Sequence, residues 1–146
     1  MQRAWVNPMG GFVAFPDTKT DGQIRAIGPE AIKVIVSQPQ IAGSPYVFTA
    51  TTGDGPFTAV SACLQRVCGF AGISDVTPHV LRHTFASIAA ELGFSELTIR
   101  AMLGHASQDY IHVDEALKLA VRRTSDEIAK LLAQGAAKLD RLRLVA

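Results

Sequence analysis

The 146-residue chain has no strong excess of either charge. Its net charge is +1, whereas proteins that bind nucleic acid over a broad surface are strongly basic. A DNA-binding surface would therefore have to be a local patch. Basic residues do cluster at Lys19 and Arg25, and again at Arg122 and Arg123.

The sequence also has few cysteines and no long apolar run. Cys63 and Cys68 have no CxxC arrangement, which argues against a metal site or a disulfide framework and favours buried thiols. No apolar run approaches the roughly 20 residues that span a bilayer, and the N-terminus lacks a signal-peptide pattern. We therefore expect a cytoplasmic protein without membrane contact, whose 48% hydrophobic content is enough for one core.

A helix is predicted from Thr77 to Gly93. Thr77 is a favourable N-cap, Pro78 suits the first helical position, and Gly93 supplies a left-handed stop. A helical apolar stripe that we expect in the core consists of Leu81, Phe85, Ile88 and Leu92.

His79 and Arg82 lie beside that stripe, near the start of the helix. Residues three apart are neighbours on a helix surface, so both side chains can reach one anion. The guanidinium offers a planar fork of donors to phosphate oxygens, and the helix N-terminus adds partial positive charge. The alternative is an exposed arginine and a histidine that only helps the helix begin, which is the commoner case for an isolated pair.

A short second helix is predicted just before His105. Ser95 caps its start, Leu97 contributes to its apolar side, and Gly104 ends it. His105 therefore follows the C-cap directly. Two scaffold helices are predicted earlier, from Gly28 to about Gln38 with Ile32, Ile35 and Val36 inward, and from about Thr58 to Gly72 with Val60, Leu64, Val67 and Cys68 inward.

Three motifs in this order resemble those of the tyrosine recombinases, the phage integrase family. They are His79-Val-Leu-Arg82-His-Thr-Phe-Ala-Ser, Leu103-Gly-His105 and Tyr110-Ile-His-Val-Asp-Glu-Ala-Leu. The resemblance covers nearly all of the chain. It implies an α+β, mainly helical fold with a small β-hairpin beside a helical bundle, and a site-specific recombinase that cuts and rejoins DNA through a covalent 3′-phosphotyrosine.

The resemblance also implies five catalytic residues. Tyr110 would be the nucleophile, and Arg82 would bind the non-bridging phosphate oxygens. His105 would donate a hydrogen bond to one of those oxygens, and His79 would accept a proton near the tyrosine. Lys19 would protonate the leaving 5′-oxygen. Because the phosphotyrosine keeps the bond energy, no cofactor and no metal are implied.

Lys19 falls near the tip of a predicted β-hairpin. Phe12-Val-Ala-Phe15 and Gln23-Ile-Arg-Ala-Ile27 are short β-prone runs joined by a turn-rich connection. A lysine at such a tip is usually only solvated. The family, however, carries a catalytic lysine in the same hairpin within a similar Thr-Lys-Thr context, which Lys19 matches.

Two other histidines have less specific interpretations. His83 is four residues after His79, a spacing that can bind zinc on a helix, but the glutamate of a His-Glu-x-x-His motif is absent. We interpret His83 as a structural hydrogen-bonding residue. His112, two residues after Tyr110, is interpreted as an orienting neighbour of the tyrosine.

The sequence departs from the family pattern in two places. The family has a further essential arginine in an Arg-x-x-Glu helix upstream of the hairpin and a separate N-terminal DNA-binding domain, and neither is found; Arg3 does not fit. Residues 1–146 are therefore expected to be a partial catalytic domain. The stretch from His105 to Tyr110 is also several residues shorter than in the family, so either Tyr110 is misplaced in the isolated chain or loop residues are missing between them.

A long amphipathic helix is predicted from about Asp114, with an interruption at Gly135. It either packs on its own core or docks on a neighbouring protomer, as family members do. The partners implied are double-stranded DNA and a homo-oligomer, a tetramer on DNA, in a bacterial or phage-encoded protein at the nucleoid. Two alternatives stay open: a truncated, inactive remnant that only binds DNA or a partner subunit, and an ordinary helical domain whose histidine and arginine do not converge.

Overall fold

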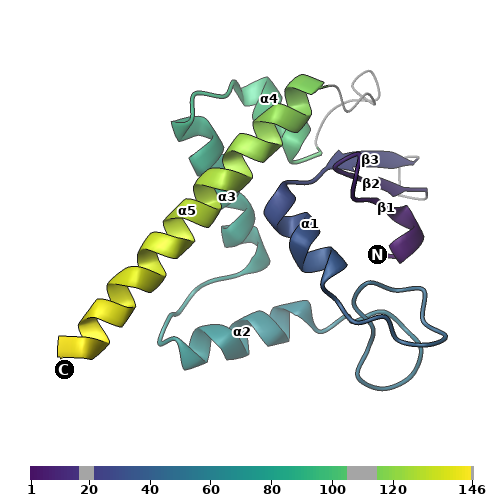
Figure 1. The fold of residues 1–146 in the computed structure, drawn as a ribbon, viewed down its shortest axis with the longest axis horizontal. Helices are drawn as coiled ribbons and strands as arrows, with labels where there is room; N and C mark the ends of the chain where they lie inside the picture. The colour runs from purple at the N-terminus through teal and green to yellow at the C-terminus, as the bar shows by residue number, and fades with distance from the viewer. Residues whose placement is uncertain (17–21, 105–114, 146) are drawn as a thin grey trace.

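The computed structural model describes residues 1–16, 22–104 and 115–145 (Figure 1). Its architecture is α+β and mainly helical, as the sequence predicts. The elements in chain order are the 3-10 helix η1 (Arg3–Trp5), the strands β1 (Val6–Asn7), β2 (Phe12–Phe15) and β3 (Gln23–Ala26), and the helices α1 (Pro29–Val36), α2 (Val60–Phe70), α3 (Pro78–Glu91), α4 (Glu96–Met102) and α5 (Glu115–Val145). No helix in this described part is both long and apolar enough to cross a bilayer.

The three strands form one antiparallel sheet in the order β1-β2-β3. β2 and β3 pair along their whole length, which confirms the predicted hairpin. β1 is an addition that the sequence did not predict, and its Val6 pairs with Val13 of β2. Gly11, just before β2, adopts a φ of +68°, which glycine reaches without steric cost. Val13 is fully buried and anchors the centre of the sheet.

The main helical core lies where α3, α4 and α5 meet. Its buried residues are Ala89, Met102, Ala120 and Val121. The small side chains of Ala89 and Ala120 allow the helix axes to approach, because interaxial distance depends on the side chains at the contact. Thr124 is also fully buried, and its hydroxyl donates to the Ala120 carbonyl at 2.9 Å, which satisfies a polar group that would otherwise be costly to bury.

The sheet is joined to the helical core through β3 and the start of α1. Ala26 of β3 packs against the core cluster. Gly28, the N-cap of α1, lies so close to α5 that a Cβ there would be 2.3 Å from the Cβ of Ser125. A larger residue at position 28 would therefore push α1 away from α5.

Several apolar residues predicted to face the core are more than half exposed. They are Val36, Val60, Val67, Leu81 and Leu97. Among the described residues, α2 makes no extensive contact with another helix or strand, so the apolar side of that helix is left partly uncovered. Helical periodicity identifies an apolar face but does not determine which element covers it.

The predicted interruption of the C-terminal helix at Gly135 is wrong, because α5 is continuous from Glu115 to Val145. A helical glycine costs about 1 kcal/mol relative to alanine, and the strong helix formers around Gly135 outweigh that cost. The first half of α5 packs on α3 and α4, whereas Leu131 and Leu132 are exposed. Figure 1 shows the C-terminal part of α5 extending away from α4 and from the sheet.

Candidate active site

The start of α3 orients the first two predicted site residues. The Thr77 hydroxyl accepts a hydrogen bond from the Val80 N–H at 3.3 Å, and Pro78 occupies the first turn, so the helix begins where the sequence predicts. His79 and Arg82 consequently lie in the first two turns of α3. His79 is exposed, whereas Arg82 is partly buried.

Arg82 connects α3 to the end of α4. Its Nη2 donates to the Leu103 carbonyl oxygen at 2.8 Å. Leu103 is the C-cap of α4, which the Ser95 hydroxyl caps at its other end by accepting from the Thr98 N–H at 3.2 Å. The helix that carries Arg82 and the backbone that leads into residue 105 are therefore held together in the folded chain.

Arg25 of β3 contacts the same carbonyl and was missed as a site residue by sequence reasoning. Its Nη1 donates to the Leu103 oxygen at 2.7 Å, across 78 positions of sequence, and its other terminal nitrogen donates to Oε1 of Gln23. The only signal in the sequence is the basic cluster of Lys19 and Arg25, which does not indicate that Arg25 contacts the end of α4. Two guanidinium groups thus share one backbone oxygen.

Gly104 provides the space that the Arg25 guanidinium occupies. A Cβ at position 104 would lie 1.5 Å from Nη1 of Arg25, so a side chain and this guanidinium cannot coexist in these positions. Gly104 also has a φ of +70°, the left-handed region in which glycine avoids the Cβ clash. Both features explain why glycine ends α4.

We expect Gly104→Ala to destabilise the fold by about 1–2 kcal/mol, since alanine loses about 1 kcal/mol in the left-handed region and displaces Arg25 from Leu103. Urea denaturation measures the change. The control is Gly135→Ala in α5, where the added Cβ meets nothing within 4 Å beyond its chain neighbours and the backbone of its own helix, and where we expect a gain of up to about 1 kcal/mol. A Gly104→Ala variant with an unchanged urea midpoint would contradict this account.

The charge of Arg25 is not balanced by a carboxylate in the described part of the chain. Its acceptors, the Leu103 carbonyl and the Gln23 amide, are neutral groups. Partial burial and the nearby charge of Arg82 lower the pKa of the Arg25 guanidinium from its ordinary value, although an arginine remains protonated at neutral pH. The two guanidinium groups therefore lie close enough for the charge of Arg82 to act on Arg25.

His79 lies against His83 one helical turn further on. Their ring centroids are 5.7 Å apart and the rings are inclined by 24°, which is a stacked arrangement. Residues 1–16, 22–104 and 115–145 contain no group of three or more His, Cys, Asp or Glu side chains able to hold a metal ion. A possible zinc pair at His79 and His83 therefore has no third ligand of these types within that part of the chain.

Three predicted catalytic residues lie outside the described residues: Lys19, His105 and Tyr110. The same holds for His112. The sequence is continuous between His105 and Tyr110, so the explanation that loop residues are missing there is wrong. The five-residue spacing from His105 to Tyr110 is a property of this sequence. A fully extended chain of that length would span about 17 Å, which is the largest distance it allows between the two residues.

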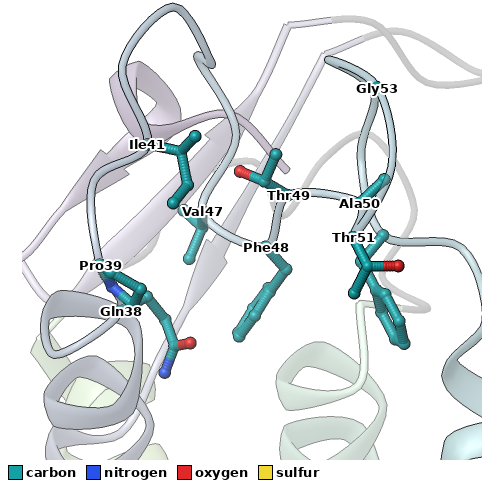
Figure 2. A pocket seen from close by; sticks show the side chains of 10 residues that line it. Gln38, Pro39, Ile41, Val47, Phe48, Thr49, Ala50, Thr51 and Gly53 are labelled. Atoms are coloured by element: carbon teal, nitrogen blue, oxygen red, sulfur yellow. The ribbon is translucent and has the colours of Figure 1, made fainter.

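A hollow of about 580 Å³ is formed by the segment between α1 and α2 (Figure 2). Figure 2 shows the side chains of Ile41, Val47 and Phe48 along its wall, and Phe57 also lines it. Among the described residues, neither His79 nor Arg82 is one of its lining residues. The convergence of Arg25 and Arg82 on Leu103 is therefore separate from this hollow.

Comparison with known proteins identifies relatives of this chain. The model of the phage integrase family matches residues 28–116. The tyrosine recombinase XerD of Agrobacterium fabrum is 32% identical over 116 residues, which are 73% of this chain and 35% of the relative. The tyrosine recombinase XerC of Nitrobacter winogradskyi is 36% identical over 86 residues, which are 54% of this chain and 26% of the relative.

The chain spans about a third or less of the length of these curated relatives. A further tyrosine recombinase XerC, from Roseiflexus castenholzii, is 45% identical over 55 residues, which are 35% of this chain and 18% of the relative. No solved structure matches the chain significantly. Because the family model covers more than half of its residues, the chain belongs to the phage integrase family, that of the tyrosine recombinases.

Proposed function

We propose that this chain supplies the catalytic centre of a site-specific DNA recombinase or integrase that works through a covalent 3′-phosphotyrosine. The observation that carries the proposal is the hydrogen bond from Arg82 to Leu103, because it joins the His79-x-x-Arg82 helix to the backbone leading into His105. Membership of the phage integrase family supports the same chemistry, and three relatives are named tyrosine recombinases.

In the proposed reaction the phenolic oxygen of Tyr110 attacks the phosphorus of one DNA phosphodiester. A bond from phosphorus to the tyrosine oxygen forms while the bond to the 5′-oxygen of the next nucleotide breaks. His79 accepts the phenolic proton, and Lys19 protonates the departing 5′-oxygen. Attack by a 5′-hydroxyl on the phosphotyrosine reverses the step, so strands rejoin without ATP, metal or cofactor.

Two hydrogen-bond donors, Arg82 and His105, stabilise the transition state in this proposal. Arg82 binds the non-bridging oxygens, which gain negative charge as the phosphorus becomes five-coordinate, and His105 donates a hydrogen bond to one of them. A guanidinium suits this role because its donors form a rigid planar fork that matches two oxygens at once. Such donors are usually among the largest contributions to catalysis.

We propose that residues 1–146 are a partial catalytic domain with the tyrosine recombinase fold. The DNA-binding domain and the first catalytic arginine of the family would come from upstream polypeptide, and the chain spans only 35% of its relative from Agrobacterium fabrum. Loss of one guanidinium from such a site costs two or more powers of ten in rate. We therefore expect the chain by itself to be nearly inactive.

The proposed partners are double-stranded DNA at the nucleoid and further copies of the same protein, forming a tetramer on DNA. The outer part of α5 supports this assembly, because Leu131 and Leu132 are exposed where the helix extends away from α4 and the sheet (Figure 1). An apolar helix face of this kind is suited to a groove on a neighbouring subunit.

The test is covalent trapping on nicked suicide duplexes, which release the cleaved strand and so prevent rejoining. The 146-residue chain is assayed alone and fused behind the upstream residues of the Agrobacterium fabrum relative, each shown to be folded by circular dichroism. A labelled pool of randomised duplexes is added, and adducts are separated by denaturing electrophoresis.

We expect an adduct from the fusion, with mass spectrometry locating the nucleotide on the peptide that contains Tyr110. No adduct from either protein would overturn the enzymatic proposal. DNA binding that persists without any adduct would identify a binding remnant instead. Because the Tyr110 phenol is the proposed attacking group, an adduct mapped to another residue would also contradict the mechanism.

A further inference from the structure

Two arginines from distant parts of the chain meet at one backbone oxygen. Arg25 comes from β3 and Arg82 from α3, and each donates a hydrogen bond to the carbonyl of Leu103, at 2.7 and 2.8 Å. Leu103 is the C-cap of α4, and the exposed carbonyls of a helix end carry partial negative charge. This carbonyl fixes both guanidinium groups at the same place.

A neutral carbonyl does not balance the positive charge of Arg25. In the described part of the chain, the acceptors of Arg25 are an amide and a backbone carbonyl, neither of which is ionised. A guanidinium has five N–H donors, and within residues 1–16, 22–104 and 115–145 these two bonds use only two of those of Arg25. Unused donors beside a second guanidinium are the features of an oxyanion site.

The environment also orients Arg25. Its head group occupies the space that a Cβ at position 104 would need, with Nη1 1.5 Å from that point, so glycine keeps the position open. Gln23 lies on the same face of β3, and its Oε1 accepts a hydrogen bond from Nη2 of Arg25. A mobile surface arginine loses side-chain entropy when it binds an anion. Arg25 would lose less, because its contacts with Leu103 and Gln23 already order it in the folded chain.

We propose that Arg25 is a second phosphate-binding guanidinium of this site and acts with Arg82 on one DNA phosphodiester. This inference rests on the proposed function for the identity of the anion. It assigns a role to a residue that none of the three recombinase motifs contains.

The test measures how strongly DNA binding depends on salt. The 146-residue chain is titrated with a mixed-sequence duplex of about 30 base pairs at several salt concentrations, and the slope of log K against log salt is determined. Each lost phosphate contact lowers the magnitude of that slope by about one. We expect Arg25→Gln to lower the slope by about one and Arg25→Lys to retain it.

The matched control is Arg66→Gln on α2. Arg66 is exposed and its replacement removes the same charge from a different face, so we expect an unchanged slope. Arg82→Gln is the positive control, with an expected fall of about one. Thermal unfolding of each variant is followed in parallel, because a residue that only stabilises the fold alters the melting temperature without altering the slope.

An Arg25→Gln slope equal to that of the unmodified chain overturns the assignment, as does an equal loss in Arg66→Gln. The salt-slope measurement and the adduct assay test different claims, so the two can fail independently. If the fusion forms an adduct but the Arg25→Gln slope does not change, the recombinase stands and the Arg25 assignment is wrong. If no adduct forms but the slope falls by about one, the phosphate site stands without the strand cleavage.

Discussion

Replacing Tyr110 by phenylalanine is expected to abolish the covalent DNA adduct, a fall in the rate of its formation of about 10⁴-fold or more. The phenyl ring fills the same volume but has no oxygen to attack phosphorus, so no other step can compensate. Affinity for DNA should change by less than about twofold, because the phenol contributes at most one hydrogen bond to the ground state. Denaturing electrophoresis of the trapped fusion protein gives the rate, and filter binding gives the affinity.

The chain offers a matched control because it contains two tyrosines, Tyr46 and Tyr110. Tyr46 lies in the segment between α1 and α2, where its backbone bridges to Gln2. We expect Tyr46→Phe to form the adduct at the unmodified rate. Adduct formation that survives in Tyr110→Phe, or that disappears in Tyr46→Phe, would show that the nucleophile has been assigned to the wrong residue.

Arg82→Ala is expected to slow adduct formation by about 10²- to 10³-fold, which corresponds to about 2.7–4 kcal/mol of transition-state stabilisation. The variant loses the donors to the non-bridging oxygens and also the hydrogen bond to Leu103. Arg82→Lys should recover only part of the rate, because an ammonium is a point charge and cannot bridge the carbonyl and the phosphate in the same geometry. Single-turnover rates at saturating DNA separate this effect from weaker binding.

Arg100→Ala serves as the control for Arg82→Ala. Arg100 lies on α4 and pairs with Glu96 at 2.7 Å, but its side chain is 63% exposed, and such a surface pair contributes little to stability. Its removal should leave the rate unchanged. A fall of less than threefold in Arg82→Ala, or an equal fall in Arg100→Ala, would place Arg82 outside the reacting centre.

Local signals predicted the start of α3 and the ends of α4. Thr77, Pro78 and Ser95 act within one helical turn, so their capping bonds depend on few residues outside that turn. The pairing of β2 with β3 was predictable for the same reason, because the two β-prone runs are close in sequence and are joined by a turn-rich connection. These features place Arg82 and the residue that precedes His105, while the role of each catalytic candidate remains a prediction.

The contribution of Arg25 could not be predicted from the sequence. It depends on a strand and a helix end that are 78 positions apart, and no local preference specifies such a meeting. The exposure of Val60 and Val67 on α2 was missed because periodicity does not reveal whether a face is covered. The helix through Gly135 was missed because one unfavourable residue is outweighed by the propensity of its neighbours.

The shared Leu103 carbonyl makes the sheet and the helices depend on one another for alignment. A hydrogen bond of 2.7 Å weakens once its atoms separate beyond about 3.5 Å, so a displacement of β3 by less than 1 Å would release Arg25 from the end of α4. Ala26, the next residue along β3, is packed against the helical core and resists such a displacement. A substitution that loosens the packing at Ala26 would therefore shift the backbone of β3 and weaken the contact of Arg25 with Leu103, even though it removes no charged group.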